Sequence, residues 1–407
     1  MTDKQQKLLD KFHDKNYFIY DQYGQNKMPA VGPIGMICLD GAKDFGAKIN
    51  SRLVDRRNEY VTNFDDSDAF TPGFVRPDYR VPVDCVRFAT GEAKAVIKNT
   101  VRGHDLYIIC DPLNYSCEYK MFGQPNRMSP DDHYQDLVRT ILAASGKAAR
   151  INVIMPFLYE GRQHRKNSRE SLDCAYMLEE LFHLGINNFI TFDAHDDRVS
   201  NSVPISGFES IPTTYQILKS MIREIPDLSF ERDKMMVISP DEGAIQRSMY
   251  FASVLGLPLG TFYKRRDYTT IRDGRNPIIA HEFLGDSVAG YDVLIVDDMI
   301  SSGDSMLDLA KILKAKNARR IFCVSSFALF TDGIERFSKA HEEGLVDYVI
   351  STNLNYHPAD LADQEWFISA DMSKFIALLI DALNHNASMS ALLDPTDKIK
   401  KLLRKMP

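Results

Sequence analysis

The sequence lacks the features of several special classes of protein. Its 407 residues include only six cysteines, and none of these forms a CxxC pair. This usage predicts buried free thiols in a reducing compartment and argues against a disulfide framework. No run approaches the ~18 apolar residues of a transmembrane helix, and the N-terminal segment MTDKQQKLLDKFHDKN lacks the apolar region of a signal peptide. We therefore expect a cytoplasmic protein with no membrane partner.

The chain also lacks an excess of positive charge. Its formal net charge is -7, so no global basic field attracts nucleic acid. Any anionic substrate must then be held by local positive groups. The length predicts two domains, because 407 residues exceed a single core of ordinary size.

Short apolar runs alternate with amphipathic helical patterns along the chain. In one such pattern, Met306, Leu309, Ala310 and Leu313 recur at the i, i+3, i+4, i+7 spacing of a helix face. This alternation predicts an α/β fold with mostly parallel sheets covered by helices, whose ligands bind beyond the carboxyl ends of the strands. The expected strands are Gly35–Leu39, Asp105–Cys110, Ile151–Met155, Asn188–Phe192, Met235–Ile238, Tyr291–Val296, Arg320–Ser325 and Tyr348–Ser351. The expected helices are Asp131–Ala149, Leu172–Leu184, Ala244–Leu255 and Ser305–Lys316.

Three segments fall outside this alternation. Residues 1–34 predict an N-terminal extension with one amphipathic helix and a connector, and the polar segment Val54–Val83 predicts a long loop or insertion. The tail KIKKLLRK predicts a short basic amphipathic helix. Such a helix is usually a docked or solvated terminus, and a membrane-surface or partner contact is the alternative.

The segment Asp297–Ser305 reads DDMISSGDS and follows an expected apolar strand. A helix beginning at Ser305 presents free backbone N–H groups and the positive end of its dipole to a phosphate. Gly303 lets the backbone approach a ligand closely, and adjacent carboxylates can accept hydrogen bonds from the 2- and 3-hydroxyls of a ribose. The segment therefore predicts a ribose 5-phosphate site. Its candidate residues are Asp297, Asp298, Ser301, Ser302, Gly303, Asp304 and Ser305.

The structural alternative for this segment is an acidic strand end followed by an ordinary helix cap. In that case Ser305 caps the helix, and Asp308 completes the capping box three residues later. This alternative explains the serine but gives no reason for two adjacent acids after an apolar strand.

The run VLIVDDMISSGDS resembles the signature of the type I phosphoribosyltransferase fold. From about Gly35 to Leu393 the chain resembles the ribose-phosphate pyrophosphokinases, also called phosphoribosyl pyrophosphate synthetases. The resemblance implies two tandem domains of this fold, at 35–205 with an insertion near 54–83 and at 206–370, with C-terminal helices at 371–407 packing back on the N-terminal domain. It also implies transfer of the diphosphoryl group of ATP to the 1-hydroxyl of ribose 5-phosphate, Mg²⁺ as cofactor, and a homo-oligomer, either a dimer or a hexamer, that shares ATP sites between subunits.

The segment Tyr263–Asp267 reads YKRRD. Lys264 and Arg266, two residues apart on an extended segment, are expected to point the same way and clamp a polyphosphate. A solvated basic loop is the structural alternative. The pair matches the family's Lys-x-Arg flexible-loop motif, which implies a catalytic role in stabilising charge on the transferred phosphoryl oxygens.

Two further apolar strands are followed directly by polar residues. Ile190–Asp197 reads ITFDAHDD, and Val237–Gly243 reads VISPDEG. A lone histidine is more often structural than functional. Both segments, however, resemble the family's D-x-H and S-P-D-x-G motifs, which implies that His195 and Asp241 lie near the magnesium of the nucleotide. Because Mg²⁺ keeps several waters, we expect few protein ligands.

The segment RQHRKNSRES, at 162–171, resembles a family segment that contacts ATP. Arg162 and Gln163 match that segment, while His164 replaces an aspartate and Arg169 matches a later arginine. Without the resemblance, a charged loop is the simpler interpretation.

The segment FATGE, at 88–92, precedes a stretch that we expect to be helical. It resembles the family's Phe-x-Asn-x-Glu pattern, which implies that Phe88, Thr90 and Glu92 bind the adenine of ATP. A stacking aromatic ring and two polar groups would suit a purine edge. In the alternative interpretation, Phe88 is a core residue.

Four positions depart from the family pattern: Thr90 replaces Asn, His164 replaces Asp, Ser301 replaces Asp, and Asp304 replaces Gly. Asp304 is the most unusual, because a carboxylate beside a phosphate site is repelled unless it turns away or meets a metal. These departures bear on adenine selectivity and rate more than on ribose-phosphate binding.

Three functions are compatible with these residues. The first is an active diphosphokinase, and the second is a non-catalytic relative that binds the ligands and regulates a partner. Lys264 and Arg266 favour the first, because a binding subunit has little need of cations that stabilise a transition state. The third, a salvage phosphoribosyltransferase, needs one such domain plus a small hood and leaves the N-terminal half unexplained.

Overall fold

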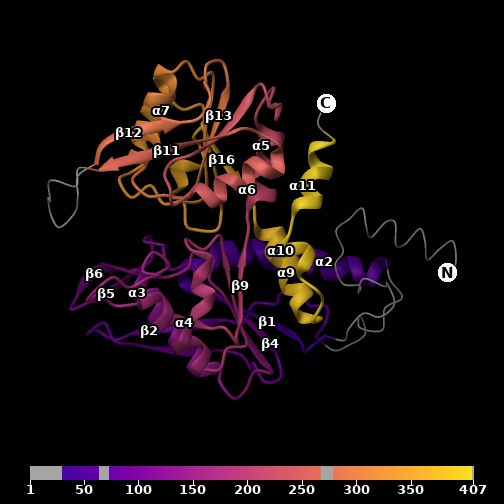
Figure 1. The fold of residues 1–407 in the computed structure, drawn as a ribbon. Helices are drawn as coiled ribbons and strands as arrows, with labels where there is room; N and C mark the ends of the chain where they lie inside the picture. Colours follow the sequence, from indigo (N-terminus) through magenta and orange to yellow (C-terminus); the bar gives the residue numbers. More distant parts are fainter. Residues whose placement is uncertain (1–29, 64–72, 267–277, 406–407) are drawn as a thin grey trace. The chain divides into compact units, whose positions relative to one another are not determined.

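The computed structural model describes residues 30–63, 73–266 and 278–405. The chain forms two compact units, of which unit 1 comprises Met1–Pro212 with Met372–Asp394 and unit 2 comprises Thr213–Asp371 with Pro395–Pro407. Each unit contains a sheet covered by helices (Figure 1). Among the described helices, none is both long and apolar enough to cross a membrane.

The main sheet of unit 1 has five parallel strands in the order β1-β4-β7-β8-β9. These strands are β1 (Ile34–Cys38), β4 (Asp105–Ile109), β7 (Arg150–Ile154), β8 (Asn188–Phe192) and β9 (Gly207–Ile211). Two antiparallel hairpins accompany it, namely β2 (Val83–Arg87) with β3 (Ala93–Ile97) and β5 (Glu118–Met121) with β6 (Gln124–Arg127). The helices of unit 1 are η1 (Asp40–Ala42), α2 (Lys43–Asn63), α3 (Pro130–Ala144), α4 (Asp173–His183), η3 (Asp197–Ser202), α9 (Ser373–Asn384) and α10 (Ser390–Leu393).

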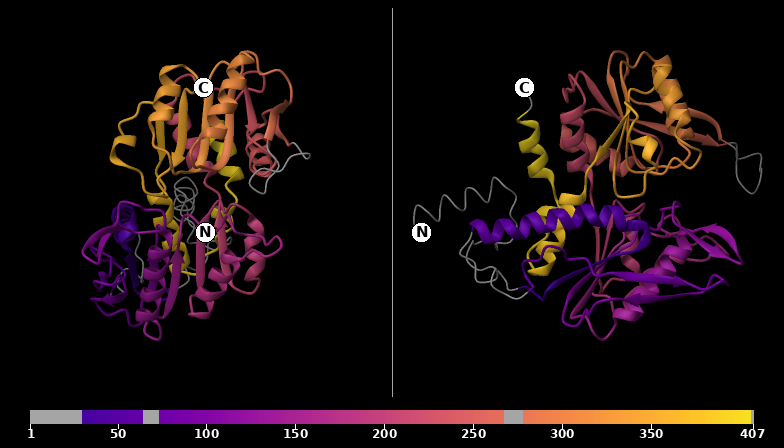
Figure 2. Two further views of the ribbon diagram at one scale, coloured as in Figure 1. Left: turned by 90° about the vertical axis from the view of Figure 1, so that its left-hand side faces the viewer. Right: turned by 180° about the vertical axis from the view of Figure 1, so that it is seen from behind.

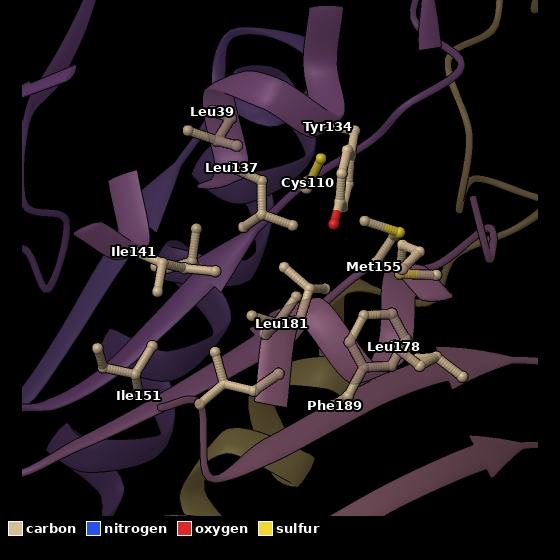
Figure 3. Packing of buried hydrophobic residues seen from close by; sticks show 14 of the residues in the cluster. Leu39, Cys110, Tyr134, Leu137, Ile141, Ile151, Met155, Leu178, Leu181 and Phe189 are labelled. Carbon is tan, nitrogen blue, oxygen red and sulfur yellow. The ribbon is translucent and has the colours of Figure 1, made fainter. Parts of the chain in front are cut away.

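Helices α3 and α4 pack on the sheet of unit 1 through apolar side chains at helical spacing. Figure 3 shows Leu137 and Ile141 of α3 and Leu178 and Leu181 of α4 in one buried cluster with Phe189 of β8. The i, i+4 and i, i+3 spacings put each pair on one helix face. Full burial of such a side chain contributes about 1.5–3 kcal/mol, so this layer is a main source of stability for the unit.

A buried ion pair joins α2 to α9, which cross in Figure 2. Nη2 of Arg57 lies 2.7 Å from Oδ1 of Asp381, and the two side chains are 1% and 0% exposed. The same Nη2 donates to Oδ1 of Asn384 at 2.9 Å, and the guanidinium lies 3.9 Å from the ring centroid of Phe74. A polar network therefore connects α2, near the start of unit 1, to α9, which belongs to the C-terminal part of the chain.

The sheet of unit 2 has seven strands in the order β12-β11-β10-β13-β14-β15-β16. Neighbouring strands are parallel except β12, which pairs antiparallel with β11. The strands are β10 (Met235–Ser239), β11 (Leu259–Arg266), β12 (Ile278–Leu284), β13 (Asp292–Ile300), β14 (Ile321–Ala328), β15 (Tyr348–Thr352) and β16 (Phe367–Ala370). The helices are α5 (Thr214–Glu224), α6 (Ile245–Leu255), α7 (Asp304–Ala315), α8 (Glu335–Glu342), η4 (Ala359–Leu361) and α11 (Thr396–Leu403).

Alternate residues of these strands face two separate cores. Met236 and Ile238 of β10 belong to the cluster with α7 and α8, whereas Met235 and Val237 belong to the cluster with α5, α6 and α11. This alternation follows from the two-residue period of a strand. The sheet is buried on both faces, so its ligand-accessible region is its edge at the strand ends.

The structure contains every expected strand, with ends shifted in all but Asn188–Phe192, and also strands that the sequence patterns missed. The missed strands are the two hairpins together with β9, β12 and β16, while β11 was expected only as an extended segment around Tyr263–Asp267. Three expectations about these elements were wrong. The helix expected over Asp131–Ala149 already ends at Ala144. The loop expected from Val54 does not begin there, because α2 continues to Asn63, and the stretch expected to be helical after Glu92 is strand β3.

The C-terminal segment divides between the two units. Helix α9 packs on α2 in unit 1, whereas α11 packs on α5 and α6 in unit 2. Residues 1–29, including the helix expected there, lie outside the described residues.

Candidate functional site

The two adjacent acids lie within the end of strand β13. The expected strand stopped at Val296, but β13 continues to Ile300, with Asp297 opposite Ser325 and Ile300 opposite Ala328 of β14. The longer pairing holds both acids on a rigid element at the carboxyl end of the sheet. In a parallel sheet this edge is where ligands bind.

The acids of this edge interact electrostatically. The backbone N–H of Asp298 donates to Oδ1 of Asp297 at 2.8 Å. Burial, the charge of Asp298 and that of Asp241 together raise the pKa of Asp297 to about 8. Asp241 follows β10, the strand beside β13, and its Oδ1 accepts from the N–H groups of Gly243 and Ala244 at 2.9 and 3.1 Å. Two separate sequence predictions thus meet at one acidic edge.

The loop after β13 brings the backbone close to α8. Gly303 has a φ of 86° and is the residue before the helix α7, which begins at Asp304 and not at Ser305. No side chain caps this helix, so the alternative of Ser305 as its cap is wrong. A Cβ on Gly303 would lie 2.3 Å from Cε2 of Phe337. Only glycine fits both this conformation and this space.

The carboxylate of Asp304 is turned toward α8. Nη1 of Arg336 donates to Oδ1 of Asp304, and the hydroxyl of Ser302 donates to Oδ2 at 3.0 Å. Asp304 and Arg336 are both largely exposed. The carboxylate that the sequence placed beside a phosphate site is therefore paired with a cation from another helix. No pattern in the sequence had singled out Arg336.

Lys264 and Arg266 have their backbone in strand β11, as the extended segment predicted. They lie opposite His281 and Ile278 of β12, and the register shifts between Arg265 and Arg266. Their side chains, and residues 267–277 that follow, lie outside the described residues. The proposed cationic clamp stays a prediction.

In unit 1, two loops bring histidines together at the carboxyl end of the sheet. The rings of His164 and His195 have centroids 5.4 Å apart. Nε2 of His164 lies 3.2 Å from Oδ2 of Asp196, and Nε of Arg198 donates to Oδ1 of Asp196 at 2.8 Å. A predicted ATP residue and a predicted metal residue are thus neighbours. Asp196 was present in the motif ITFDAHDD but was not chosen as a candidate.

The segment around Gln163 is an ordered loop. Its backbone N–H donates to the carbonyl of Glu160 at 2.8 Å, and its side-chain amide donates to the carbonyl of Ser171 at 2.6 Å. Arg162 is exposed beside it. The amide of Gln163 closes the loop, and the arginine faces solvent, where an anion can reach it.

Phe88, Thr90 and Glu92 lie in the turn between β2 and β3. The N–H of Phe88 donates to the carbonyl of Glu92 at 2.7 Å, and the hydroxyl of Thr90 donates to Oε2 of Glu92 at 2.9 Å. The side chain of Phe88 is 48% exposed, so the interpretation of this residue as core is wrong. An aromatic ring beside two polar groups on an exposed turn is suited to a base.

The residues of the described ranges include no cluster of three or more His, Cys, Asp or Glu side chains placed to hold a metal ion. His195 belongs to unit 1 and Asp241 to unit 2. The adjacent acids Asp297 and Asp298 do offer hard oxygen donors whose mutual repulsion a cation would relieve. A pair of acids is the kind of sparse ligand set that Mg²⁺ accepts, because this ion keeps several waters.

Two family models match the chain. The model for the N-terminal domain of ribose phosphate pyrophosphokinase matches residues 75–185, and the phosphoribosyl transferase domain model matches residues 205–362. The ribose-phosphate pyrophosphokinase of Prochlorococcus marinus is 30% identical over 276 residues, which cover 67% of this chain and 74% of that protein. That of Mycoplasma pneumoniae is 29% identical over 313 residues, which cover 75% and 85%.

The fold agrees with these sequence matches. The crystal structure of phosphoribosylpyrophosphate synthetase from Mycobacterium smegmatis aligns with a TM-score of 0.66 at 18% identity, covering 87% of this chain and 99% of that one. The expected α/β fold of two tandem phosphoribosyltransferase-type domains is confirmed. The chain belongs to the ribose-phosphate pyrophosphokinase family.

Proposed function

We propose that the protein transfers the diphosphoryl group of ATP to the 1-hydroxyl of ribose 5-phosphate, releasing phosphoribosyl pyrophosphate and AMP. The observation that carries this proposal is the end of β13, where two acids lead through the Gly303 turn into the start of α7. Acids that accept from sugar hydroxyls and N–H groups that bind a phosphate suit the two ends of one substrate.

In the proposed reaction, the oxygen of the 1-hydroxyl attacks the β-phosphorus of ATP, and the hydroxyl proton is released to solvent. The bond from that phosphorus to the oxygen bridging it to the α-phosphorus breaks, and AMP leaves. Asp297 and Asp298 orient the sugar by accepting from its 2- and 3-hydroxyls, and the loop from Ser301 to Ser305 holds its phosphate. Lys264 and Arg266 stabilise the charge that develops on the transferred oxygens.

The nucleotide is held, in this proposal, by residues of unit 1. Phe88 stacks on adenine while Thr90 and Glu92 read its edge. The loop with Arg162, Gln163 and His164 contacts the phosphates. By the family resemblance, His195 and Asp241 are the residues that would help to hold Mg²⁺, which would neutralise phosphate charge and polarise the phosphorus–oxygen bonds.

The competing functions are less well supported. The two sequence relatives reported above are both named as ribose-phosphate pyrophosphokinases, which favours the catalytic function. A salvage transferase with one such domain would not account for the match at residues 75–185. A protein that does not catalyse the transfer would also have little need of Lys264 and Arg266, which are proposed to stabilise charge on the transferred oxygens.

The family resemblance suggests an assembly in which subunits share ATP sites, so we propose a homo-oligomer. The exposed position of Phe88 supports this, since an exposed aromatic side chain can enter a neighbouring subunit's site. Light scattering after gel filtration would measure the assembly, and a monomer at working concentration would contradict it.

A cytoplasmic location is also proposed. All six cysteines are free, which suits a reducing cytoplasm.

The activity is tested by mixing the protein with ATP, Mg²⁺ and ribose 5-phosphate and measuring AMP. Binding of ribose 5-phosphate is measured separately by calorimetry. We expect one AMP for each phosphoribosyl pyrophosphate formed. Absence of AMP while ribose 5-phosphate still binds would remove the catalytic proposal and leave the non-catalytic binding function.

A further inference from the structure

The start of α7 carries a negative charge at the place where the proposed substrate brings its own. Asp304 is the first residue of the helix, directly after Gly303. Its Oδ2 accepts from the hydroxyl of Ser302 at 3.0 Å, so the carboxylate lies beside the loop that is proposed to bind the phosphate. The helix dipole attracts any anion to this end, a side-chain carboxylate as well as a phosphate. Left alone, Asp304 would therefore compete with the substrate.

An arginine of α8 pairs with the carboxylate of Asp304. Nη1 of Arg336 donates to Oδ1 of Asp304 and lies 3.6 Å from Oδ2 of Asp332. Among the described residues, Arg336 is the basic side chain whose ion pair reaches this loop. The guanidinium thus draws Asp304 toward α8 and balances its charge.

Arg336 is placed by a rigid part of the fold. The next residue, Phe337, is fully buried, and its ring centroid lies 5.1 Å from that of Phe330 and 5.8 Å from that of Trp366. Phe337 is also the residue that lies against Gly303. The contact between Phe337 and Gly303 shapes the loop that is proposed to bind the phosphate. The same contact therefore also sets the position of Arg336.

We infer that Arg336 is a positioning residue for ribose 5-phosphate: it holds the carboxylate of Asp304 away from the phosphate-binding N–H groups, so that the loop accepts a phosphate monoester despite an acid at its edge. This inference rests on the proposed function and adds a residue outside the loop to the sugar-phosphate site. It also accounts for a carboxylate at a position where a small residue would be simpler.

A plain surface ion pair is the competing interpretation. The side chains of Arg336 and Asp304 are 47% and 59% exposed, and such pairs contribute only about 0–1 kcal/mol to stability. If the pair only stabilised the helix start, its loss would change unfolding slightly and leave substrate binding unaltered. The two interpretations therefore differ in the KM for one substrate.

The test uses Arg336→Gln, Asp304→Asn and the double variant in the full-length protein. Steady-state kinetics give kcat and the KM for each substrate, and calorimetry measures ribose 5-phosphate binding. We expect Arg336→Gln to raise the KM for ribose 5-phosphate about tenfold, which corresponds to ~1.4 kcal/mol, with kcat and the KM for ATP nearly unaltered. Asp304→Asn should lower that KM, and adding it to Arg336→Gln should reverse most of the increase.

Lys339→Gln is the matched control, because it removes the same charge from α8 while Lys339 pairs with Glu343, the residue directly after the helix, at 3.7 Å. It should leave the KM for ribose 5-phosphate unaltered. An unchanged KM in Arg336→Gln would overturn the inference. An equal increase in the single and double variants would also overturn it, because Arg336 would then act without Asp304. In either case a wild-type protein that still forms AMP would leave the proposed function standing.

Discussion

The backbone of Gly303 lies so close to the ring of Phe337 that a Cβ added to the glycine would be 2.3 Å from Cε2 of the ring. The φ of Gly303 is 86°, a region that costs other residues about 1–3 kcal/mol. We predict that Gly303→Ala destabilises unit 2 by this strain and by a further ~1–3 kcal/mol of overpacking. Chemical denaturation measures the loss.

Gly256 provides the control for this prediction. Its φ is 70°, but a Cβ there would meet nothing within 4 Å. Gly256→Ala should therefore lower the free energy of unfolding only by the cost of the backbone strain. Equal losses in the two variants would show that the contact with Phe337 has no energetic effect.

The raised pKa of Asp297 predicts a particular pH dependence of stability. Burial and the neighbouring charges of Asp298 and Asp241 raise that pKa from 3.8 to about 8. Between these values the folded state keeps a proton that the unfolded state releases, so the free energy of unfolding falls as pH rises and levels off above about 8. Asp297→Asn should remove this slope.

The measurement is the difference in unfolding free energy between wild type and Asp297→Asn from pH 4 to pH 9. The variant should gain relative stability as pH rises through this window. Asp308→Asn serves as the control, because Asp308 is an exposed acid on α7. A difference that is constant with pH would contradict the prediction.

The ion pair between Arg57 and Asp381 should be costly to break. Burial alone would raise the pKa of Asp381, but the charges of Arg57 and Arg56 lower it to about 2. Asp381→Asn leaves a buried arginine without its counter-ion, which costs about 3–5 kcal/mol. The exposed pair of Asp84 and Lys98 is the control, and Asp84→Asn should cost less than ~1 kcal/mol.

The lowered pKa of Asp381 also sets the pH range in which its ion pair with Arg57 stabilises the fold. Because the folded value lies below the unfolded one, the stabilisation is fully present above about pH 4 and is lost as pH falls toward 2. Acid titration of unit 1 unfolding should therefore show a larger loss in wild type than in Asp381→Asn. Parallel acid profiles would argue against the ion pair as a source of stability.

Phe88 should contribute to nucleotide binding and little to stability. Its side chain is 48% exposed, so Phe88→Ala should change the unfolding free energy by less than ~0.5 kcal/mol. Stacking on a base is worth about 1–3 kcal/mol, which predicts a KM for ATP raised by roughly tenfold or more, with ribose 5-phosphate binding unaltered. Tyr176→Ala, at an aromatic side chain 68% exposed on α4, is the control. A stability loss without a KM effect would restore the structural interpretation.

Lys264 should be needed for turnover and not for sugar binding. Lys264→Ala is expected to abolish AMP formation while calorimetry still detects ribose 5-phosphate, because the cation acts on the charge of the transferred phosphoryl oxygens. Arg265→Ala changes the intervening residue and should retain far more activity. Unaltered turnover in Lys264→Ala would remove this residue from the mechanism.

Local patterns were sufficient to predict much of the fold and the central site. The apolar runs of β10 and β13 marked central strands because both faces of a parallel sheet are buried. The hairpin strands and β16 were missed because their residues are half-exposed or few in number. The end of β13 was placed too early, because the acids at its tip are not typical of a strand.

The sequence by itself determined the alternation of strands and helices, the acidic strand end and the glycine turn, since each depends on residues near one another in the chain. Only the tertiary structure decided that Asp304 turns to Arg336, that Gly303 meets Phe337 and that His164 lies beside Asp196. These contacts join residues about thirty positions apart. Their partners are selected by how helices and loops pack across a sheet edge, and no spacing along the chain records that choice.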